Sequence, residues 1–445
     1  MICAWSRFLP RKTMEDVNRS VRSMLSYAYH HVPFYRELYD RAGVHPDLVR
    51  SVDDLPLLPV ISRLELMAGG PASYLNRKAN PEKLTVKHTT GTTGNPVTVY
   101  MNFAEQAFRK ITMMDAYSRN TWIKFPLRAL DVGTERKDAA TTLVSRTGPH
   151  KRVRLFRGMP MDEQIDLLFK TRPSLIAGRP STLWELALAL STRGLTPPRP
   201  AILISNVEML FPHVRRLLED VFRCKVHDCY NCEEAGNLAW QCPKHPDRMH
   251  PNTAVVWIEI LDANNRPLPF GREGRVVITN LFNRTMPFIR YSMGDRAVLL
   301  DWEKCDCGHH GPVMRLTEGR SENFIVLPDG REVSPRIVFD LVNRAFPYDT
   351  PGWNMIDAIR TFQIIQETEK LIVIKVVPGP AYSDSLWPKV ERNLSELHPA
   401  LRLNVELVDD LTPAPGKKFH QVLGKLGSRW TRAMENVNAT AGEQK

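Results

Sequence analysis

This sequence of 445 residues lacks three features: blocks of like charge, long apolar runs and an even number of cysteines. No run of five or more like charges appears, which argues against a nucleic-acid-binding arm and against a polybasic membrane anchor. No stretch approaches the roughly 18 apolar residues of a membrane span, and the apolar start of the chain is too short for a signal peptide. We therefore expect a cytoplasmic protein with no membrane span and no nucleic-acid partner.

The seven cysteines are an odd number in a long chain, which argues against a disulfide framework. The formal net charge is +11, from 60 basic and 49 acidic residues. Nucleic acid, an anionic membrane surface or a polyanionic small molecule such as ATP could each account for this charge. Because the basic residues are scattered along the chain, the small molecule is the favoured explanation.

Apolar runs alternate with amphipathic segments through the first two thirds of the chain. Helical spacing predicts helices over 14–42, 162–170, 181–193 and 211–222. Short apolar runs predict strands at 84–87, 97–101, 175–177 and 201–204, while the proline-punctuated stretch 55–59 is typical of a surface loop. This alternation predicts a layered α/β domain.

The pattern changes near residue 253. Runs such as 255–260, 274–278 and 297–300, joined by turn residues, predict an antiparallel β subdomain over about 250–318. Strands near 361–366, 371–377 and 402–408 with a helix near 384–397 predict a small α+β domain. We expect a large N-terminal α/β domain over 1–320, a C-terminal α+β lid domain over 321–430, and a disordered tail over 431–445.

The segment with the clearest chemistry is His88-Thr89-Thr90-Gly91-Thr92-Thr93-Gly94. Its two glycines let the backbone approach a ligand closely, and successive backbone N–H groups in such a turn form a pocket for anions. The threonine hydroxyls add further donors. The segment therefore predicts a polyphosphate site, although no GK[ST] follows and it is not a Walker loop. A Thr/Gly-rich hairpin turn is the alternative.

Four later segments carry weaker signals of the same kind. In the first, Tyr230 can stack on a base and Glu234 can hold Mg²⁺ beside phosphates. In the second, Arg290-Tyr291-Ser292-Met293-Gly294-Asp295, the carboxylate of Asp295 suits a ribose diol. The third and fourth are Gly319-Arg320-Ser321-Glu322-Asn323 and Pro415-Gly416-Lys417-Lys418-Phe419. Taken singly, each is also typical of an ordinary loop.

In this order and at these separations, the five segments resemble the adenylate-forming superfamily of acyl-CoA ligases, adenylation domains and luciferases. The phenylacetate–coenzyme A ligase branch, with its capsule-biosynthesis-type members, is the nearest resemblance. His31-Val32-Pro33-Phe34-Tyr35-Arg36 is similar to that branch's N-terminal lead-in. The resemblance covers roughly residues 20–425 and implies a two-step reaction. A carboxylate attacks the α-phosphorus of ATP to give an acyl-adenylate and pyrophosphate, and a thiol or an amine then displaces AMP.

The resemblance also implies roles for single residues. It places Thr89 to Gly94 around the phosphates, Glu208 and Tyr230 near the adenine, and Glu234 on Mg²⁺. It places Asp295 on the ribose hydroxyls, Arg320 near ribose and phosphate, and Glu322 at the hinge of the lid. Lys418 would stabilise the charge that develops during adenylation, with Lys417 as its competitor. The sequence departs from the family pattern at Val97 in place of lysine, Asn231 in place of glycine, and Glu233 in place of serine or threonine.

Four further residues have the chemistry of a structural zinc site. Cys242 and His245 form a C-x-x-H pair, and Cys305 and Cys307 form a C-x-C pair. Thiolates and imidazoles are the ligands that Zn²⁺ prefers in proteins. His250 competes with His245, while His309 and His310 are substitutes, and reduced packing cysteines are the alternative. Some members of the resembled branch have a similar set of residues.

The sequence leaves three kinds of protein open. The first is a ligase that uses ATP and Mg²⁺ to join an aryl or acyl carboxylic acid to coenzyme A. The second is an amide ligase or an enzyme that loads a carrier protein. The third is a nucleotide-binding homologue that has lost catalysis, which the three departures would explain. The acid and the oligomeric state stay open, with a homodimer among the options.

Overall fold

The computed structural model describes residues 12–88, 97–119, 127–134, 150–156, 159–300, 305–317, 324–333, 335–346, 358–411 and 420–426. Contacts divide the chain into two compact units. The first takes the described residues up to Met293 together with Val298–Leu316. The second takes Gly294–Ala297 and the described residues from Thr317 onward. The fold is mixed α/β, as the sequence predicted.

The N-terminal segment is helical over 14–42, as the sequence predicted, and it consists of two helices. Helix α1 (Met14–His31) starts at a capping box between Thr13 and Asp16, and α2 (Pro33–Ala42) follows after one residue. Pro33 lacks the N–H that would continue α1, but it suits the first turn of a new helix. Short helical elements follow: η1 (Pro46–Leu48), η2 (Val52–Leu57), α3 (Arg63–Met67), α4 (Pro71–Tyr74) and η3 (Pro81–Lys83). Part of the expected proline-rich loop is therefore 3-10 helix.

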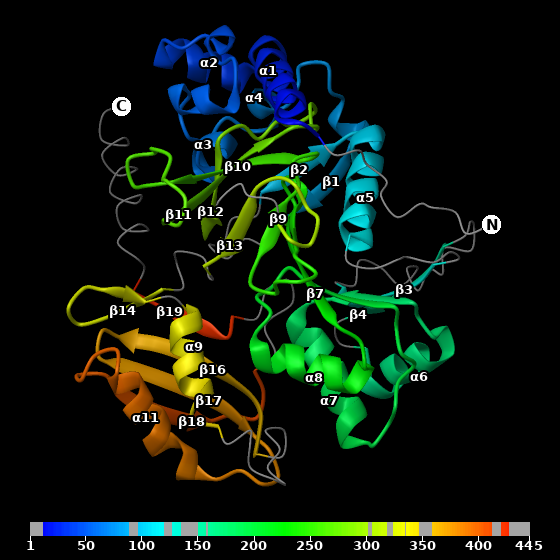
Figure 1. Ribbon diagram of the computed structural model, residues 1–445, viewed down its shortest axis with the longest axis vertical. Helices are drawn as coiled ribbons and strands as arrows, with labels where there is room; N and C mark the ends of the chain where they lie inside the picture. The colour runs from blue at the N-terminus through cyan, green and yellow to red at the C-terminus, as the bar shows by residue number, and fades with distance from the viewer. Residues whose placement is uncertain are drawn as a thin grey trace. The chain divides into compact units, whose positions relative to one another are not determined.

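The first unit is built on one sheet of eleven strands (Figure 1). Its order is β10-β11-β12-β13-β9-β8-β7-β6-β5-β3-β4. The parallel part comprises β3 (Leu127–Thr134), β4 (His150–Phe156), β5 (Leu175–Gly178), β6 (Ile202–Asn206) and β7 (Val226–Cys232). The other strands are β8 (Gly236–Gln241), β9 (Met249–Pro251), β10 (Val256–Leu261), β11 (Glu273–Asn280), β12 (Tyr291–Leu300) and β13 (Val313–Leu316). The strands expected as an antiparallel subdomain thus continue the same sheet.

Four helices accompany these strands: α5 (Phe103–Ser118), α6 (Met161–Thr171), α7 (Pro180–Thr192) and α8 (Pro212–Phe222). Helices α6 to α8 gather around the parallel strands (Figure 1), and α5 packs on β8. Asn102 caps α5 through a capping box with Glu105. The carboxylate of Glu105 is buried and also accepts the backbone N–H groups of Arg284 and Thr285 at 2.8 and 2.9 Å. These bonds anchor the first turn of α5 to the loop that precedes β12.

The second unit contains a four-stranded sheet in the order β18-β17-β16-β19 and a two-stranded ribbon. The sheet strands are β16 (Ile359–Thr368), β17 (Leu371–Pro378), β18 (Arg402–Leu407) and β19 (Val422–Gly424). The ribbon strands are β14 (Ile325–Val326) and β15 (Glu332–Val333), and the helical elements are α9 (Pro335–Asn343), η5 (Asp384–Leu386) and α11 (Trp387–Ser395). Helices α9 and α11 pack together, and α11 also packs on β18. Within the described ranges, no helix combines the length and the apolarity that crossing a bilayer requires.

Candidate functional site

The predicted phosphate loop joins two paired strands. β1 (Thr85–His88) and β2 (Thr98–Met101) are antiparallel, with His88 opposite Thr98. Thr89 to Gly94 between them lie outside the described residues, as do Arg320, Glu322, Lys417 and Lys418. Val97 is 1% exposed. The position where many relatives carry lysine is therefore an apolar core position in this chain.

The carboxyl ends of β5, β6 and β7 lie at one edge of the parallel sheet, where open α/β sheets bind their ligands. The predicted adenine turn follows β6. Val207 has φ of 73°, and the N–H of Glu208 donates to the carbonyl of Asn206 at 2.9 Å. Such a γ-turn with a positive φ at a β-branched residue is strained. Strain of this kind gathers at functional positions.

The Glu208 carboxylate has a local partner. Its Oε2 accepts the backbone N–H of Ser181, in the first turn of α7, at 3.2 Å. Helix N-termini attract negative charge, because their first N–H groups have no partner within the helix. Glu208 therefore ties the turn after β6 to the start of α7.

Tyr230 and Glu234 flank the end of β7, next to that turn. Tyr230 lies opposite Ala239 of β8, and β7 ends at Cys232 before the chain turns back at Gly236. The side chain of Glu234 is buried at 8% exposure. A buried carboxylate has the chemistry of a Mg²⁺ ligand.

The two departures in this segment each have a partner. The side-chain amide of Asn237 donates to the Asn231 carbonyl oxygen at 2.8 Å, across the β7–β8 pair. Glu233 accepts from the guanidinium of Arg109 on α5 at 2.8 Å. Both unusual residues are thus integrated into the structure.

A half-buried carboxyl group, that of Asp228, lies on β7. Asp228 Oδ1 accepts the hydroxyl of Ser205 on β6 at 3.0 Å and the N–H of Cys229 at 3.1 Å. Burial raises the pKa of Asp228 to about 6, against the stabilising effects of Ser205, Arg215 and the Cys229 N–H. This bond joins the two strands that carry Glu208 and Tyr230.

Cys229 and Cys232 have raised thiol pKa values. Burial is the main cause for both, and a neighbouring carboxylate adds to it, Asp228 for Cys229 and Glu234 for Cys232. The thiolate is the nucleophilic form of cysteine. Both side chains are therefore suited to packing rather than to carrying an acyl group.

Asp295 lies on β12 in the second unit, directly after Gly294 with φ of 78°. The sequence predicted a glycine turn here, and the structure has continuous strand around the left-handed glycine. The first residue of this motif, Arg290, precedes β12 in the first unit and is 1% exposed. Its guanidinium donates to both carboxylate oxygens of Glu259, at 3.0 and 3.2 Å, and to the carbonyl of Leu58. Burial raises the pKa of Glu259, and the Arg290 charge opposes this rise.

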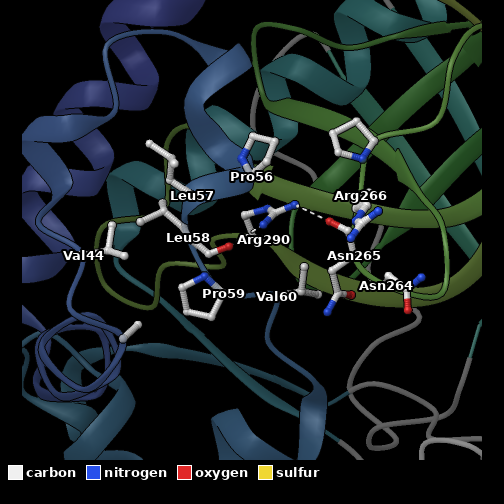
Figure 2. Close-up of a pocket in the computed structure, with 12 residues that line it drawn as sticks. Val44, Pro56, Leu57, Leu58, Pro59, Val60, Asn264, Asn265, Arg266 and Arg290 are labelled. Atoms are coloured by element: carbon white, nitrogen blue, oxygen red, sulfur yellow. Dashed lines mark hydrogen bonds between the residues drawn. The ribbon is translucent and has the colours of Figure 1, made fainter.

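Arg290 also lines a cavity of about 380 Å³ (Figure 2). Its walls are Pro56–Val60 and Asn264–Pro267, with Ala42 and Val44. Because Glu259, the Leu58 carbonyl and the Asn265 carbonyl already accept from the guanidinium, we assign no ligand to this cavity. Arg290 serves to hold the proline-rich segment against the sheet.

Cys242, His250, Cys305 and Cys307 form a separate cluster. Each offers one ligand atom, and these atoms all lie within 4.8 Å of one another. The sulfurs of Cys242 and Cys305 are 3.7 Å apart, and Cys307 Sγ is 3.3 Å from His250 Nε2. Two sulfurs bound to one tetrahedral Zn²⁺ at about 2.3 Å would lie about 3.8 Å apart. The cysteines are free rather than disulfide-bonded.

His250 rather than His245 meets the three thiols. His250 is fully buried on β9, burial lowers its pKa to about 4, and its Nδ1 has no hydrogen-bond partner. An imidazole with so low a pKa is neutral at physiological pH, which is the form that binds metals. His245 instead contacts the exposed Asp306, at 2.7 Å. The side chains present therefore fit a tetrahedral zinc.

Proteins of known activity share this sequence pattern and this fold. The phenylacetate-coenzyme A ligase of Thermus thermophilus is 26% identical over 369 residues, 78% of this chain and 79% of the ligase. That of Escherichia coli K12 is 26% identical over 327 residues, 68% of this chain and 70% of the ligase. This chain is thus similar to phenylacetate–coenzyme A ligases over most of its length. No protein-family model matches it.

Solved structures agree with this relationship in fold. A 2-hydroxyisobutyryl-CoA ligase in its postadenylation state, in complex with R3-HIB-AMP, superposes with a TM-score of 0.75 at 21% identity. The match covers 98% of this chain and 94% of that ligase. ATP-bound MatB from Rhodopseudomonas palustris gives a TM-score of 0.52 at 15% identity, over 83% of this chain and 71% of MatB. This chain thus shares its fold with that 2-hydroxyisobutyryl-CoA ligase.

Proposed function

We propose that this chain activates a carboxylic acid with ATP and transfers the acyl group to coenzyme A. The observation that carries the proposal is the arrangement of two predicted site segments at the carboxyl edge of the parallel sheet. There the strained turn before Glu208 and the Tyr230–Glu234 segment end neighbouring strands, as the resemblance to the adenylate-forming superfamily implies for an adenine site. Phenylacetate–CoA ligase relatives and acyl-CoA ligase neighbours support the reaction type.

The reaction has two steps. A carboxylate oxygen attacks the α-phosphorus of ATP, the bond to the β-phosphate oxygen breaks, and pyrophosphate leaves. The thiolate of coenzyme A then attacks the acyl carbon, and AMP leaves with the bonding pair of the carbon–oxygen bond. Mg²⁺ would neutralise charge on the phosphates. Positioning and electrostatic stabilisation supply most of the catalysis in such displacements.

Each candidate residue has a proposed part in this scheme. Tyr230 stacks beside the adenine, and Glu208 supports the adjoining turn through its bond to the start of α7. Glu234 holds Mg²⁺, and Asp295 binds the ribose hydroxyls. The residues outside the described ranges keep the roles that the resemblance implies: Thr89 to Gly94 around the phosphates, Arg320 near the ribose, and Lys418 at the developing charge. The domain from 321 to 430 would act as the mobile lid.

The test is acid-dependent release of pyrophosphate. Purified protein is incubated with Mg-ATP and a panel of aryl and acyl acids, and then with coenzyme A or amines as acceptors. We expect AMP and a thioester with at least one acid. We expect Glu234→Gln to lower kcat by about 100-fold or more, the usual cost of losing a charged group that stabilises a transition state. Glu163→Gln, on the exposed face of α6, is the matched control.

Two outcomes would reject this function. Adenylate formation without consumption of coenzyme A would favour the amide-ligase or carrier-loading alternative. Binding of Mg-ATP without AMP production under any acid would favour a homologue that has lost catalysis. A cytoplasmic location and a homodimeric state are further proposals, which fractionation and light scattering would test.

We also propose that Cys242, His250, Cys305 and Cys307 bind a structural zinc ion. The metal would join β9 to the loop before β13 and take no part in the reaction. Purified protein should contain about one zinc per chain, the stoichiometry of a closed four-ligand site. His250→Ala should lose the metal, whereas His245→Ala and Cys224→Ser should keep it. Loss of zinc from His245→Ala with retention in His250→Ala would contradict the assignment.

A further inference from the structure

Arg109 reaches the predicted nucleotide site from outside its motifs. It lies on α5, one turn after Glu105, whose carboxylate anchors that helix to Arg284 and Thr285. The Arg109 side chain is 18% exposed. It therefore extends from a fixed helix into a mostly buried environment.

The guanidinium makes three contacts with two consecutive residues. Nη1 donates to the carbonyl of Glu233 at 2.8 Å, and Nη2 donates to the carbonyl of Cys232 at 3.2 Å and to the Glu233 carboxylate at 2.8 Å. Gly236 provides the space for the stem of the side chain. A Cβ at this position would lie 3.0 Å from Arg109 Cγ, and its φ of 84° is one that other residues rarely adopt. The contacts thus fix both the backbone and the charge of the segment before Glu234.

The charge at residue 233 makes these contacts chemically important. Glu233 and Glu234 are consecutive carboxylates in a segment proposed to face Mg²⁺ and phosphates. An unpaired Glu233 would compete for the cation and repel the phosphates, because like charges at short range disfavour each other strongly in a partly buried site. A planar guanidinium can bind the carboxylate and the carbonyls at the same time, which a lysine ammonium cannot do with the same geometry.

We propose that Arg109 is a positioning residue of the nucleotide site, which pairs with Glu233 and so leaves Glu234 as the carboxylate that receives Mg²⁺. The inference rests on the proposed function. It assigns this chain's departure at Glu233 to a matched pair rather than to lost activity. The pair has two separable effects: the carbonyl contacts shape the backbone, and the ion pair removes the extra negative charge.

A double-mutant cycle between Arg109 and Glu233 tests the proposal. The variants are Arg109→Met, Glu233→Thr and the double variant, with Arg109→Lys as the conservative change. Lys110→Met, on the exposed side of the same helix, is the control. The readouts are the Kd of Mg-ATP, with EDTA as the metal-free comparison, the KM for Mg-ATP and the melting temperature.

We expect Arg109→Met to weaken Mg-ATP binding about 10-fold, while Glu233→Thr alone stays within about 3-fold of the wild type; coupling of this size is usual between contacting residues. The double variant should recover to within about 3-fold of wild type. Recovery is the diagnostic result, because Glu233→Thr removes the released charge but restores none of the carbonyl contacts. Binding measured in EDTA should change less than binding measured in Mg²⁺.

Each outcome decides between the inference and its alternatives. If the double variant binds Mg-ATP no better than Arg109→Met, Arg109 acts only on the backbone and the proposal fails. Arg109→Met could fail to fold. In that case the proposal fails if neither Arg109→Lys nor Glu233→Thr changes how strongly ATP binding depends on Mg²⁺. If the wild type binds Mg-ATP and the variants show this coupling, but no acid leads to AMP, the proposed function fails and the Arg109–Glu233 pairing stands. A wild type that does not bind Mg-ATP would overturn both.

Discussion

Replacing Asp228 by asparagine should stabilise the protein, and more so at neutral than at acidic pH. The carboxyl group is half-buried on β7, and its pKa is raised to about 6 from an ordinary value of 3.8, mainly by desolvation. Asparagine has nearly the same shape, and its side-chain oxygen can still accept the hydroxyl of Ser205 and the N–H of Cys229. The substitution therefore removes the titration while keeping those two hydrogen bonds.

The direction in which stability changes with pH depends on whether the folded or the unfolded chain holds the proton of Asp228. Below pH 4, Asp228 is protonated in both the folded and the unfolded chain and contributes no pH dependence. Between pH 4 and pH 6 the unfolded chain has lost the proton while the folded chain keeps it, so stability falls as the pH rises. Above pH 6 the penalty is complete, and a shift of about two pKa units corresponds to about 3 kcal/mol.

Urea unfolding of the wild type and Asp228→Asn at pH 5.0 and pH 7.5 measures this effect. We expect the stability advantage of the variant to be about 1.4 kcal/mol larger at pH 7.5, because roughly half of the penalty is already present at pH 5. Asp220→Asn, on the exposed face of α8, controls for the change in net charge. An advantage that is equal at both pH values, or that is larger at pH 5.0, would refute the reasoning.

Two other substitutions test a strained turn and a buried ion pair in the first unit. Val207→Gly should raise the free energy of unfolding by about 1 kcal/mol, because glycine adopts a φ of 73° without strain; a lower urea midpoint would show that the valine side chain stabilises the turn. Glu259→Gln should lower the free energy of unfolding by about 3–5 kcal/mol, because it leaves the charge of Arg290 buried without its counter-ion. A loss below about 1 kcal/mol in thermal unfolding would mean that the carbonyl contacts of Arg290 carry the stability.

The parallel part of the fold could be predicted because its strands and helices have simple patterns. Buried strands such as β5 and β6 are short apolar runs, and α7 and α8 follow them with helical spacing. Helix α5 was not predicted. It buries Glu105, Thr112 and Asp115, so polar residues occupy part of its inner face. The strands β3 and β4 were also not predicted, and arginines and aspartate alternate with their apolar residues.

Some residues of the candidate site could be predicted from the sequence, and others depend on the fold. Short motifs predicted Tyr230, Glu234 and the cysteine pairs as site residues, because each lies within a few residues of its partners in the motif. The choice between His245 and His250 depends on how β9 runs beside β13, because His250 lies with the three cysteines whereas His245 lies with Cys305 and Asp306. Arg109 contacts Glu233 across 124 residues, and nothing in the local sequence indicates that pairing. Asn231 and Glu233, two of the departures from the family pattern, each have a side-chain partner in the structure.

The N-terminal helices depend on a segment that is synthesised much later. Tyr35 in α2 is fully buried, where its hydroxyl donates to the carbonyl of Pro287 and accepts the N–H of Ile289, some 252 residues away. The carbonyl of Leu58 likewise accepts from the guanidinium of Arg290, which is synthesised much later. At about 5–20 residues per second, a ribosome needs on the order of 10 to 50 seconds to cover that distance. During that interval α1 and α2 lack the partners that bury Tyr35, so the amino terminus of this protein completes its packing only when the strand carrying Asp295 is about to emerge.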